Sequence, residues 1–351
     1  MSIKRMTALS ARRIRWRYAA LVFAPLVVGF GRPEVSPERS VAESVAHRAM
    51  EPAGAQGARK NGGGGNLIDH GGVVLGSSKT YAIYWGTQSD FPSDLEAGME
   101  ELLSGFSGSS YLGIAMQYMR GAAVSTAYAG ASIDVSAPPR RAPRVSDIAN
   151  EVCKLFPSPD PDTLYIVFTS NAPRVNYCSW HASATCNGVT FQVAYVPNQG
   201  LLPACSPYTV KNLGCNQLSE GTVSSADSVA HEFMEAITDA HLDAWYDQNG
   251  LEIGDKCNYD YQACVALGNG SSWQIQSEWS NSIGGCQQQY QAHNAPCSGR
   301  HRHPLRTPCD IGDAQIFEVA VGRLRSRDCT PAWRSAGQGI VGRPGFAMPS
   351  S

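Results

Sequence analysis

The stretch SSADSVAHEFMEAITDAHLDAWYDQNGLEIGD, residues 224–255, decides how the rest of the chain is interpreted. It contains the segment HEFME, in which His231 and Glu235 are four positions apart. Residues i and i+4 of a helix project from one face, so this spacing would aim both side chains at the same point. Glu232 stands where zinc peptidases of the His-Glu-x-x-His type keep their general base. Here Glu235 replaces the second histidine of that motif.

A helix is predicted around this segment. Ser224, followed three residues later by Asp227, predicts a capping box at its start. Apolar residues recur at helical spacing and predict one buried face, formed by Ala226, Val229, Ala230, Phe233 and Ile237. The polar side chains on the other side are either a solvated face or a metal-binding face. A histidine flanked by carboxylates at these offsets favours the metal.

A third ligand is expected downstream of this helix. Asp239 is about 12 Å along a straight helix from His231, which suits a partner of a ligand better than a ligand. Glu252 follows the turn signal of residues 247–250 and could return to the ion, with Asp255 in reserve. The ligand set His231, Glu235 and Glu252 predicts a divalent metal, with zinc expected. Because two of these ligands are carboxylates, manganese, iron and calcium remain open.

Six segments of the chain are similar to one known family. They are residues 70–75 (HGGVVL), 81–86 (YAIYWG), 177–181 (YCSWH), 230–239 (AHEFMEAITD), 243–246 (DAWY) and 252–255 (EIGD). Together they resemble the exordium-like, or phosphate-induced protein 1, family over about residues 66–290. The resemblance implies a secreted protein, which in plants is associated with the cell wall and with growth responses. It brings no settled catalytic activity, so the enzymatic hypothesis depends on the residues themselves.

The other histidines have structural interpretations beside functional ones. His181 either reaches the metal or stabilises a substrate oxyanion, or it is a structural residue in a loop between Cys178 and Cys186. The structural interpretation is favoured, since a lone histidine is more often a satisfied structural group. His70 is expected to open a strand, and His241 is expected to be exposed.

The ends of the chain differ from its centre. A basic start followed by the short apolar run of residues 19–30 predicts a signal peptide, or an uncleaved anchor, over residues 1–31. Residues 32–65 are expected to form a disordered linker or a propeptide. Residues 66–290 form the predicted domain, and the Arg- and Pro-rich residues 291–351 a tail of low order. A secreted or cell-envelope location follows.

Cysteine usage supports export. Eight of the eleven cysteines lie in the predicted domain: Cys153, Cys178, Cys186, Cys205, Cys215, Cys257, Cys264 and Cys286. An even number behind a signal-like start predicts disulfides rather than metal thiolates. Neighbour pairs such as Cys178–Cys186 and Cys205–Cys215 are plausible, although the sequence does not choose among the connectivities.

The expected fold class is α+β or α/β, disulfide-stabilised. Strands are predicted at residues 79–85, 162–169 and 189–195, and helices at residues 93–106, 109–119 and 146–156, the last capped by Ser146. The predicted metal-binding helix follows the last strand. This order resembles that of zincins, in which a layered sheet precedes an active-site helix.

Two classes of function follow. The first is a secreted zinc-dependent hydrolase of the peptidase type, with Glu232 as base. The second is a non-catalytic extracellular protein with a structural metal or a role in binding cell-wall polysaccharide. Aromatic side chains that could stack on sugar rings are Trp245, Tyr246, Trp273 and Trp279. The chain has 43% hydrophobic residues, enough for a sizeable core, and a net charge of −2, which gives no argument for nucleic acid. A monomer without a stable membrane span is expected.

Overall fold

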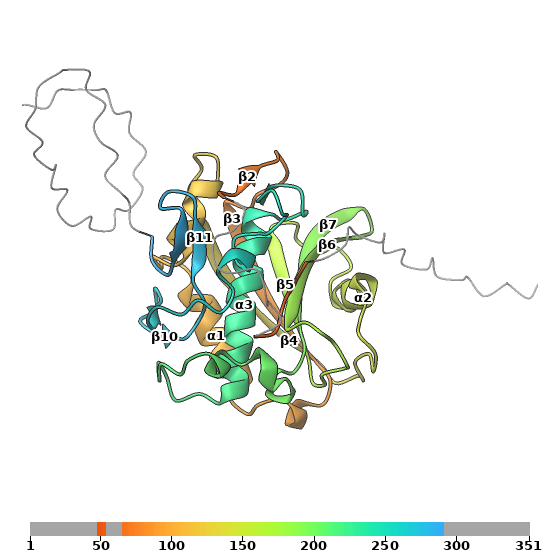
Figure 1. Cartoon of the computed structure of the whole chain (residues 1–351). Coiled ribbons are helices and arrows are strands. Elements are labelled where there is room, and N and C mark those ends of the chain that lie inside the picture. Colours follow the sequence, from red (N-terminus) through yellow and green to blue (C-terminus); the bar gives the residue numbers. More distant parts are fainter. Residues whose placement is uncertain (1–47, 54–64, 291–351) are drawn as a thin grey trace, which may run out of the picture. The chain divides into compact units, whose positions relative to one another are not determined.

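A six-stranded mixed sheet forms the centre of the molecule (Figure 1). The computed structural model describes residues 48–53 and 65–290. The strand order is β1-β6-β7-β5-β3-β4. Four strands run parallel, whereas β6 is antiparallel to β7 and to β1. Their bounds are β1 Arg48–Met50, β3 Ser77–Trp85, β4 Ser125–Asp134, β5 Thr163–Thr169, β6 Ser179–Cys186 and β7 Val189–Val196.

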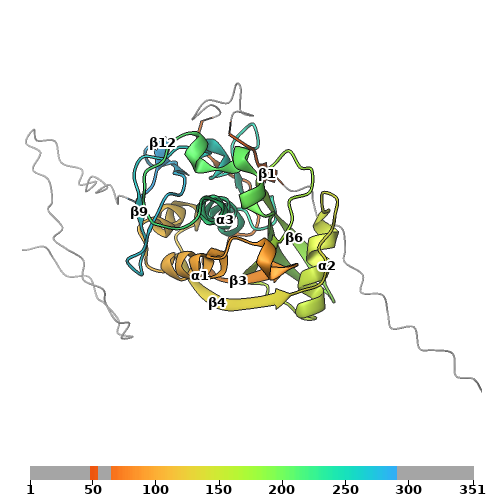
Figure 2. The same cartoon turned by 90° about the horizontal axis from the view of Figure 1, so that it is seen from below.

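Helices cover both faces of this sheet (Figure 2). Helices α1 (Leu95–Gly105) and α3 (Glu220–Thr238) pack on one face, and α2 (Val145–Leu155) packs on the other. Strand β5 is buried throughout, and its alternate side chains serve the two cores. Leu164, Ile166 and Phe168 face α1 and α3, and Tyr165 and Val167 face α2. Burial on both faces explains the continuous apolar run of this strand.

The coarse fold class is confirmed, since helices and strands mix in one layered domain. The strands predicted at residues 79–85, 162–169 and 189–195 are β3, β5 and β7, and the helices predicted at 93–106 and 146–156 are α1 and α2. The segment predicted as a helix at 109–119 is instead a 3-10 helix, η2 (Leu112–Tyr118). There the amide of Ile114 bonds the carbonyl of Tyr111, three residues back.

Two predicted helix caps are wrong. Helix α3 begins at Glu220, because the hydroxyl of Ser219 accepts the amide of Thr222. Ser224 lies inside the helix, where its hydroxyl donates to the carbonyl of Glu220. Helix α2 is capped at Arg144 rather than at Ser146. There the carboxylate of Asp147 accepts the amide of Arg144. Both helices therefore start before the expected position.

Strands β1, β4 and β6 are absent from the sequence-based prediction. Strand β6 reads SWHASATC, in which the alternation is present but the residues are small. Its Trp180, Ala182 and Ala184 join the core beneath α2. Their alternation with a period of two residues is the sequence signal that could have predicted this strand. Strand β1 lies inside the predicted linker, and pairing with β6 orders it.

Outside the central sheet the chain forms three small antiparallel sheets and several short 3-10 turns. The pairs are β2 (Ile68–Asp69) with β8 (Trp245–Tyr246), β9 (Val265–Ala266) with β10 (Ser272–Trp273), and β11 (Glu278–Ser280) with β12 (Gly285–Gln287). The remaining 3-10 turns are η1 (Gln88–Asp90), η3 (Gln199–Leu201), η4 (Pro203–Cys205), η5 (Pro207–Thr209) and η6 (Asp255–Cys257). Trp273 and Trp279 are buried in the core, so they cannot stack on a sugar.

Four disulfides link distant segments. They join Cys153 to Cys186, Cys178 to Cys205, Cys215 to Cys264, and Cys257 to Cys286. The neighbour pairs Cys178–Cys186 and Cys205–Cys215 are therefore wrong. Cys178 and Cys186 lie at or next to opposite ends of β6, and an extended strand holds its ends too far apart for a disulfide.

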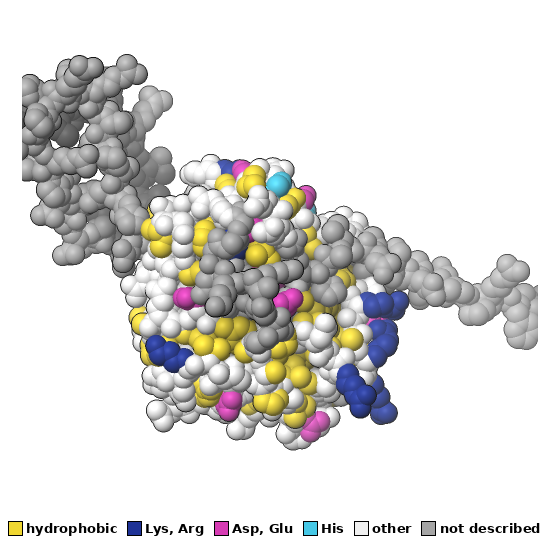
Figure 3. All heavy atoms as spheres, in the orientation of Figure 1, with side chains coloured by type: hydrophobic (Ala, Val, Ile, Leu, Met, Phe, Trp, Pro, Cys, Tyr) yellow, Lys and Arg dark blue, Asp and Glu magenta, His cyan; other side chains and the backbone are white. Residues whose placement is uncertain are grey.

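The surface and the chain ends complete the description. On the face shown in Figure 3 the basic side chains gather mainly at the edge on the side of α2. Within residues 48–53 and 65–290, no helix is both long and apolar enough to cross a membrane. The predicted signal peptide or anchor (1–31) and the predicted tail (291–351) lie outside the described residues.

Candidate metal centre

Helix α3 supplies the first group of candidate ligands. His231, Glu232 and Glu235 are each at most 1% exposed. The predicted polar face is therefore not solvated, because loops and small sheets cover α3 on the side away from the sheet. The Nε2 atom of His231 lies 3.2 Å from Oε1 of Glu235, as the i and i+4 spacing predicts.

Strand β6 places His181 beside the candidate ligands of α3. Its Nε2 atom lies 3.3 Å from Oε1 of Glu252 and 3.6 Å from Oε2 of Glu235. The predicted position of His181 in a disulfide-bordered loop is wrong, since His181 lies in a strand. Within the described residues neither of its ring nitrogens has a hydrogen-bond partner, and its structural or functional role stays a prediction. His181 lies on the face of the sheet that packs against α3. Only the tertiary fold brings it close to the side chains of that helix.

Glu252 returns to the helix after a tight turn. The carbonyl of Asp247 accepts the amide of Gly250, and the chain then runs back so that Glu252 is fully buried. Asp255 follows, with Oδ1 3.9 Å from Nε2 of His231. Its amide donates to Oε1 of Glu235. The predicted third ligand and its reserve thus both reach the centre.

Asp239 lies outside these groups, at the end of α3. Its Oδ1 accepts the amides of Asp243 and Ala244, each at 2.6 Å. Its carboxyl group also interacts with the side chain of Glu252. Asp239 therefore fixes the loop after α3 and steadies Glu252, in agreement with the predicted role as partner of a ligand.

Two sets of three side chains have donor atoms within 4.8 Å of one another. The first set is His181, Glu235 and Glu252, and the second is His231, Glu232 and Glu235. Glu235 belongs to both, with one carboxylate oxygen facing each histidine. The candidate ligands therefore form one continuous cluster around Glu235.

Gln276 orients His231 and was not predicted. Its Nε2 donates to the carbonyl of Gly254 at 3.0 Å, which turns its Oε1 toward Nδ1 of His231 at 3.2 Å. An acceptor at Nδ1 selects the tautomer with the proton there, so Nε2 keeps its lone pair for the cluster. No sequence motif marks Gln276, which belongs to the irregular region after α3.

Asp227 holds the segment that contains Gln276. Its two oxygens accept the backbone amide of Gln276 at 2.8 Å and the hydroxyl of Tyr261 at 2.5 Å. Burial raises the pKa of Asp227 to about 6, and these two donors oppose that rise. The residue predicted as a helix cap instead anchors the segment that orients His231.

The backbone approaches the cluster closely at Gly254. A methyl group there would lie 2.8 Å from Nδ1 of His231 and 3.0 Å from Oε1 of Glu235. A Cβ atom essentially never lies less than 3.0 Å from another atom, so a larger residue here would require the side chain of His231 to shift. The loop is thus fitted around the ligand atoms.

Electrostatics distinguish Glu232 from its neighbours. Burial raises the pKa of Glu232 to about 7, although the charge of His231 opposes the shift. Burial also disfavours ionisation of Glu235, but His231 and His181 outweigh it and lower the pKa of that carboxyl. For His231 burial lowers the pKa, and the carboxylates, Glu235 foremost, raise it well above its usual value. One carboxyl near neutrality beside an ionised one is the pattern of an acid–base site.

The cluster fits a divalent ion. A four-coordinate zinc with bonds near 2.1 Å holds its ligand atoms about 3.4 Å apart. The separations of 3.2 Å between His231 and Glu235, 3.6 Å between His181 and Glu235, and 3.3 Å between His181 and Glu252 are close to this spacing. Several buried carboxylates facing two histidines carry excess negative charge, which a cation would neutralise. The donor set alone does not select the metal, because carboxylate oxygens also suit manganese, iron and calcium.

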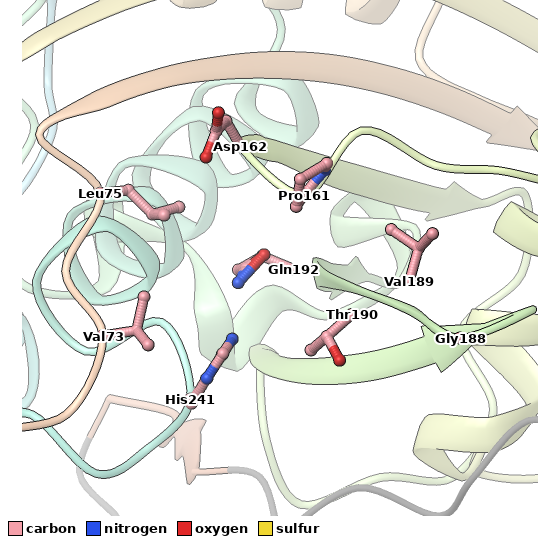
Figure 4. A pocket seen from close by; sticks show the side chains of 9 residues that line it. All are labelled: Val73, Leu75, Pro161, Asp162, Gly188, Val189, Thr190, Gln192 and His241. Atoms are coloured by element: carbon pink, nitrogen blue, oxygen red, sulfur yellow. The ribbon is translucent and has the colours of Figure 1, made fainter.

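A pocket of about 430 Å³ lies on the same face of the sheet as His181 (Figure 4). His181 is opposite Ala194 of β7. Gln192, two residues before Ala194 in the same strand, points into the pocket. Side chains two apart in a strand share a face and are about 7 Å apart. His241 is half-buried in the pocket wall, whereas exposure was predicted. His70 stacks on Tyr246 beside β2 and belongs to neither ligand set.

Comparison of the chain with protein-family models, curated proteins and solved structures found no match.

Proposed function

We propose that this chain is a secreted, zinc-dependent hydrolase of the peptidase type. The ligands are His181, His231, Glu235 and Glu252, which extends the set expected from the sequence by one histidine. A second, neutral imidazole adds a nitrogen ligand to His231, Glu235 and Glu252 without adding negative charge. The enlarged set therefore suits a Lewis-acid metal better.

One observation supports this proposal above the others, namely that two histidines and two glutamates from three separate segments meet beside a third, differently ionised glutamate. A structural ion requires the ligands alone. The adjacent Glu232 has no evident structural need, and its carboxyl is buried at a cost in solvation. Its position beside the ligands is explained by proton transfer.

A divalent ion in the cluster would polarise a substrate carbonyl group and lower the pKa of water. Glu232 accepts the proton of the attacking water and returns it to the leaving amine. Its pKa near 7 suits both steps, since the group can hold or release a proton near neutral pH. Gln276 and Asp227 keep His231 oriented during turnover.

The alternative is a non-catalytic extracellular protein with a structural metal. The complete burial of the cluster favours this alternative, because a catalytic ion needs a path for substrate. The resemblance to the exordium-like family, with its association with the cell wall, points the same way. Trp245 and Tyr246 are half-buried, and His70 stacks on one face of the Tyr246 ring, so sugar stacking there would need the other faces of these rings.

Elemental analysis of the full chain, purified without chelator or metal-affinity resin, tests the metal. One equivalent of a divalent ion, lost in both His181→Ala and His231→Ala, supports the centre. A folded protein free of metal would remove the basis of the hydrolase.

Two further variants separate catalysis from structure. Glu232→Gln should abolish turnover of a peptide library while one equivalent of metal remains bound. Undiminished turnover in that variant would contradict the mechanism. Glu235→His should raise zinc affinity if the ligand geometry is that of a zincin, and should only destabilise a hydrogen-bonded structural site.

A further inference from the structure

Strand β1 lies directly along the strand that carries His181. The pairing is antiparallel, with Arg48 opposite His181 and Met50 opposite Ser179. Directly opposite residues of an antiparallel pair project to the same face of a sheet. The side chain of Met50 therefore projects to the face on which α3 and the metal candidates lie.

Met50 is the apolar anchor of this segment. It is fully buried, and the hydroxyl of Ser179 lies 3.7 Å from its sulfur atom. The same hydroxyl interacts with the carboxyl group of Glu232. Ser179 thus lies between Met50 and Glu232, the proposed general base. Met50 therefore forms part of the layer that covers the candidate metal centre.

A few backbone bonds hold the rest of residues 48–53. The carbonyl of Met50 accepts the amide of Cys178 at 2.7 Å, and the amide of Ala53 donates to Ala204 at 3.0 Å. The carbonyl of Glu51 accepts from the side chain of Asn258. The first of these bonds adjoins the ladder between β1 and β6 and is the kind of main-chain contact that binds an added strand at a sheet edge, whereas the other two tie residues 51–53 to η4 and to a side chain.

Strand β6 extends beyond the residues that pair with β1. Among the described residues, β1 pairs with residues 179–181 of β6, whereas β7 pairs with β6 as far as Cys186. Ser183 and Thr185, on the face of His181, are half-buried. Ser183 is opposite Gln192 of β7, so the strand runs from His181 toward the pocket that contains Gln192.

We propose that β1 occupies the binding place of the substrate, and that the substrate is an extended peptide that adds antiparallel to the edge of β6. This rests on the proposed hydrolase function. The register of β1 places the substrate residue that replaces Arg48 opposite His181, and an apolar residue in the place of Met50. The ligands are at most 1% exposed while β1 is seated, so β1 leaves before substrate enters.

The occupancy of β6 is tested in the full chain with Met50→Asp, which places a charge in a buried apolar position. Met50→Leu is the matched control, because it conserves volume and apolar character. Hydrogen exchange of the amides of residues 179–181 should be about tenfold faster or more in Met50→Asp than in Met50→Leu, with β5 and β7 unchanged. Equal exchange in the two variants would overturn the displaceable role of β1.

Peptide binding is tested with a fluorescent peptide of residues 46–53 (AHRAMEPA). It should bind Met50→Asp, fail to bind Met50→Leu, and lose affinity when its own methionine is replaced by aspartate. Unrelated extended peptides with an apolar residue at that position should compete with it. Absence of binding to a variant whose β6 exchanges rapidly would overturn the proposal.

If Met50→Asp unfolds the whole chain, Ala53→Pro provides a second test. It removes the amide that donates to Ala204 and buries no charge. Exchange and peptide binding require no metal and no turnover, so they can succeed where the hydrolase proposal fails. In metal-loaded protein, the peptide should also slow the loss of metal to a chelator.

Discussion

The Nε2 atom of His181 on strand β6 lies 3.3 Å from Oε1 of Glu252, which follows helix α3 and its turn. Both side chains are fully buried. An imidazole and a carboxylate at this distance, with no hydrogen bond to either imidazole nitrogen from the described residues, are spaced as two ligands of one ion. This relationship makes His181 the residue whose role differs most between sequence and structure.

Removal of His181 should therefore affect metal binding as strongly as removal of His231. His181→Ala is expected to weaken metal affinity by about 100-fold or more, because loss of a partner outside the ligand shell already costs about 10- to 100-fold. His241→Ala is the control, since His241 lines the pocket and belongs to neither ligand set. Competition with a chromogenic chelator measures the affinities, and equal affinity in His181→Ala and His241→Ala would exclude His181 as a ligand.

Gln276→Leu should weaken the metal site without unfolding the domain. The change removes the acceptor at Nδ1 of His231, so the tautomer is no longer selected, and affinity should fall about 10- to 100-fold. Gln274→Leu is a matched control because Gln274 is equally buried but holds Leu213 and Lys211 instead. Similar metal affinities in the two variants would show that Gln276 does not orient the ligand.

Gly254→Ala should displace ligand atoms. The added methyl group would contact His231 and Glu235 at distances that packing does not allow, so affinity should fall about tenfold or more. Gly285→Ala tests the same change where no atom lies within 4 Å and should leave affinity unchanged. The titrations used for His181 provide the comparison. Unaltered binding in Gly254→Ala would mean that the loop moves away freely.

Stability should depend on pH through Glu151 on α2. Burial, together with Asp134, raises the pKa of Glu151 from 4.5 to about 7. Between these values the folded chain keeps a proton that the unfolded chain has lost, so the free energy of unfolding falls as pH rises through this window. Glu151→Gln cannot titrate. The fall in wild-type stability between pH 4.5 and 7 should exceed that of the variant by about 1–2 kcal/mol, since one pKa unit is about 1.4 kcal/mol and Lys154 nearby is exposed.

Urea denaturation of both proteins at several pH values measures this difference. A parallel pH dependence in wild type and Glu151→Gln would contradict the raised pKa.

The disulfide between Cys178 and Cys205 should contribute to stability near the centre. It closes a segment of 27 residues, which corresponds to about 3–4 kcal/mol of chain entropy in the unfolded state. The double variant Cys178→Ala, Cys205→Ala should lose about that much free energy of unfolding. Peptide mapping of the oxidised protein should recover the Cys178–Cys205 peptide. Recovery of a Cys178–Cys186 peptide would contradict the fold of β6.

The sequence predicts the helix that carries the candidate ligands, because His231 and Glu235 are related by local helical geometry alone. The core strands β3, β5 and β7 are likewise evident, since their runs of apolar and β-branched residues have few other uses. Glu252 was predicted as a ligand because it follows a turn signal in the sequence. These inferences succeed because each depends on contacts that are close in sequence.

Tertiary structure decided the rest. His181, Gln276 and Met50 reach the centre through sheet pairing and through the folding of irregular loops, and no local pattern encodes such distant contacts. The pairing of the cysteines was equally hidden, since many connectivities satisfy the same spacing. The helix therefore determined which ion-binding residues to expect. The sheet, by carrying β6 beneath α3, decided which histidine joins them and which segment of the chain covers them.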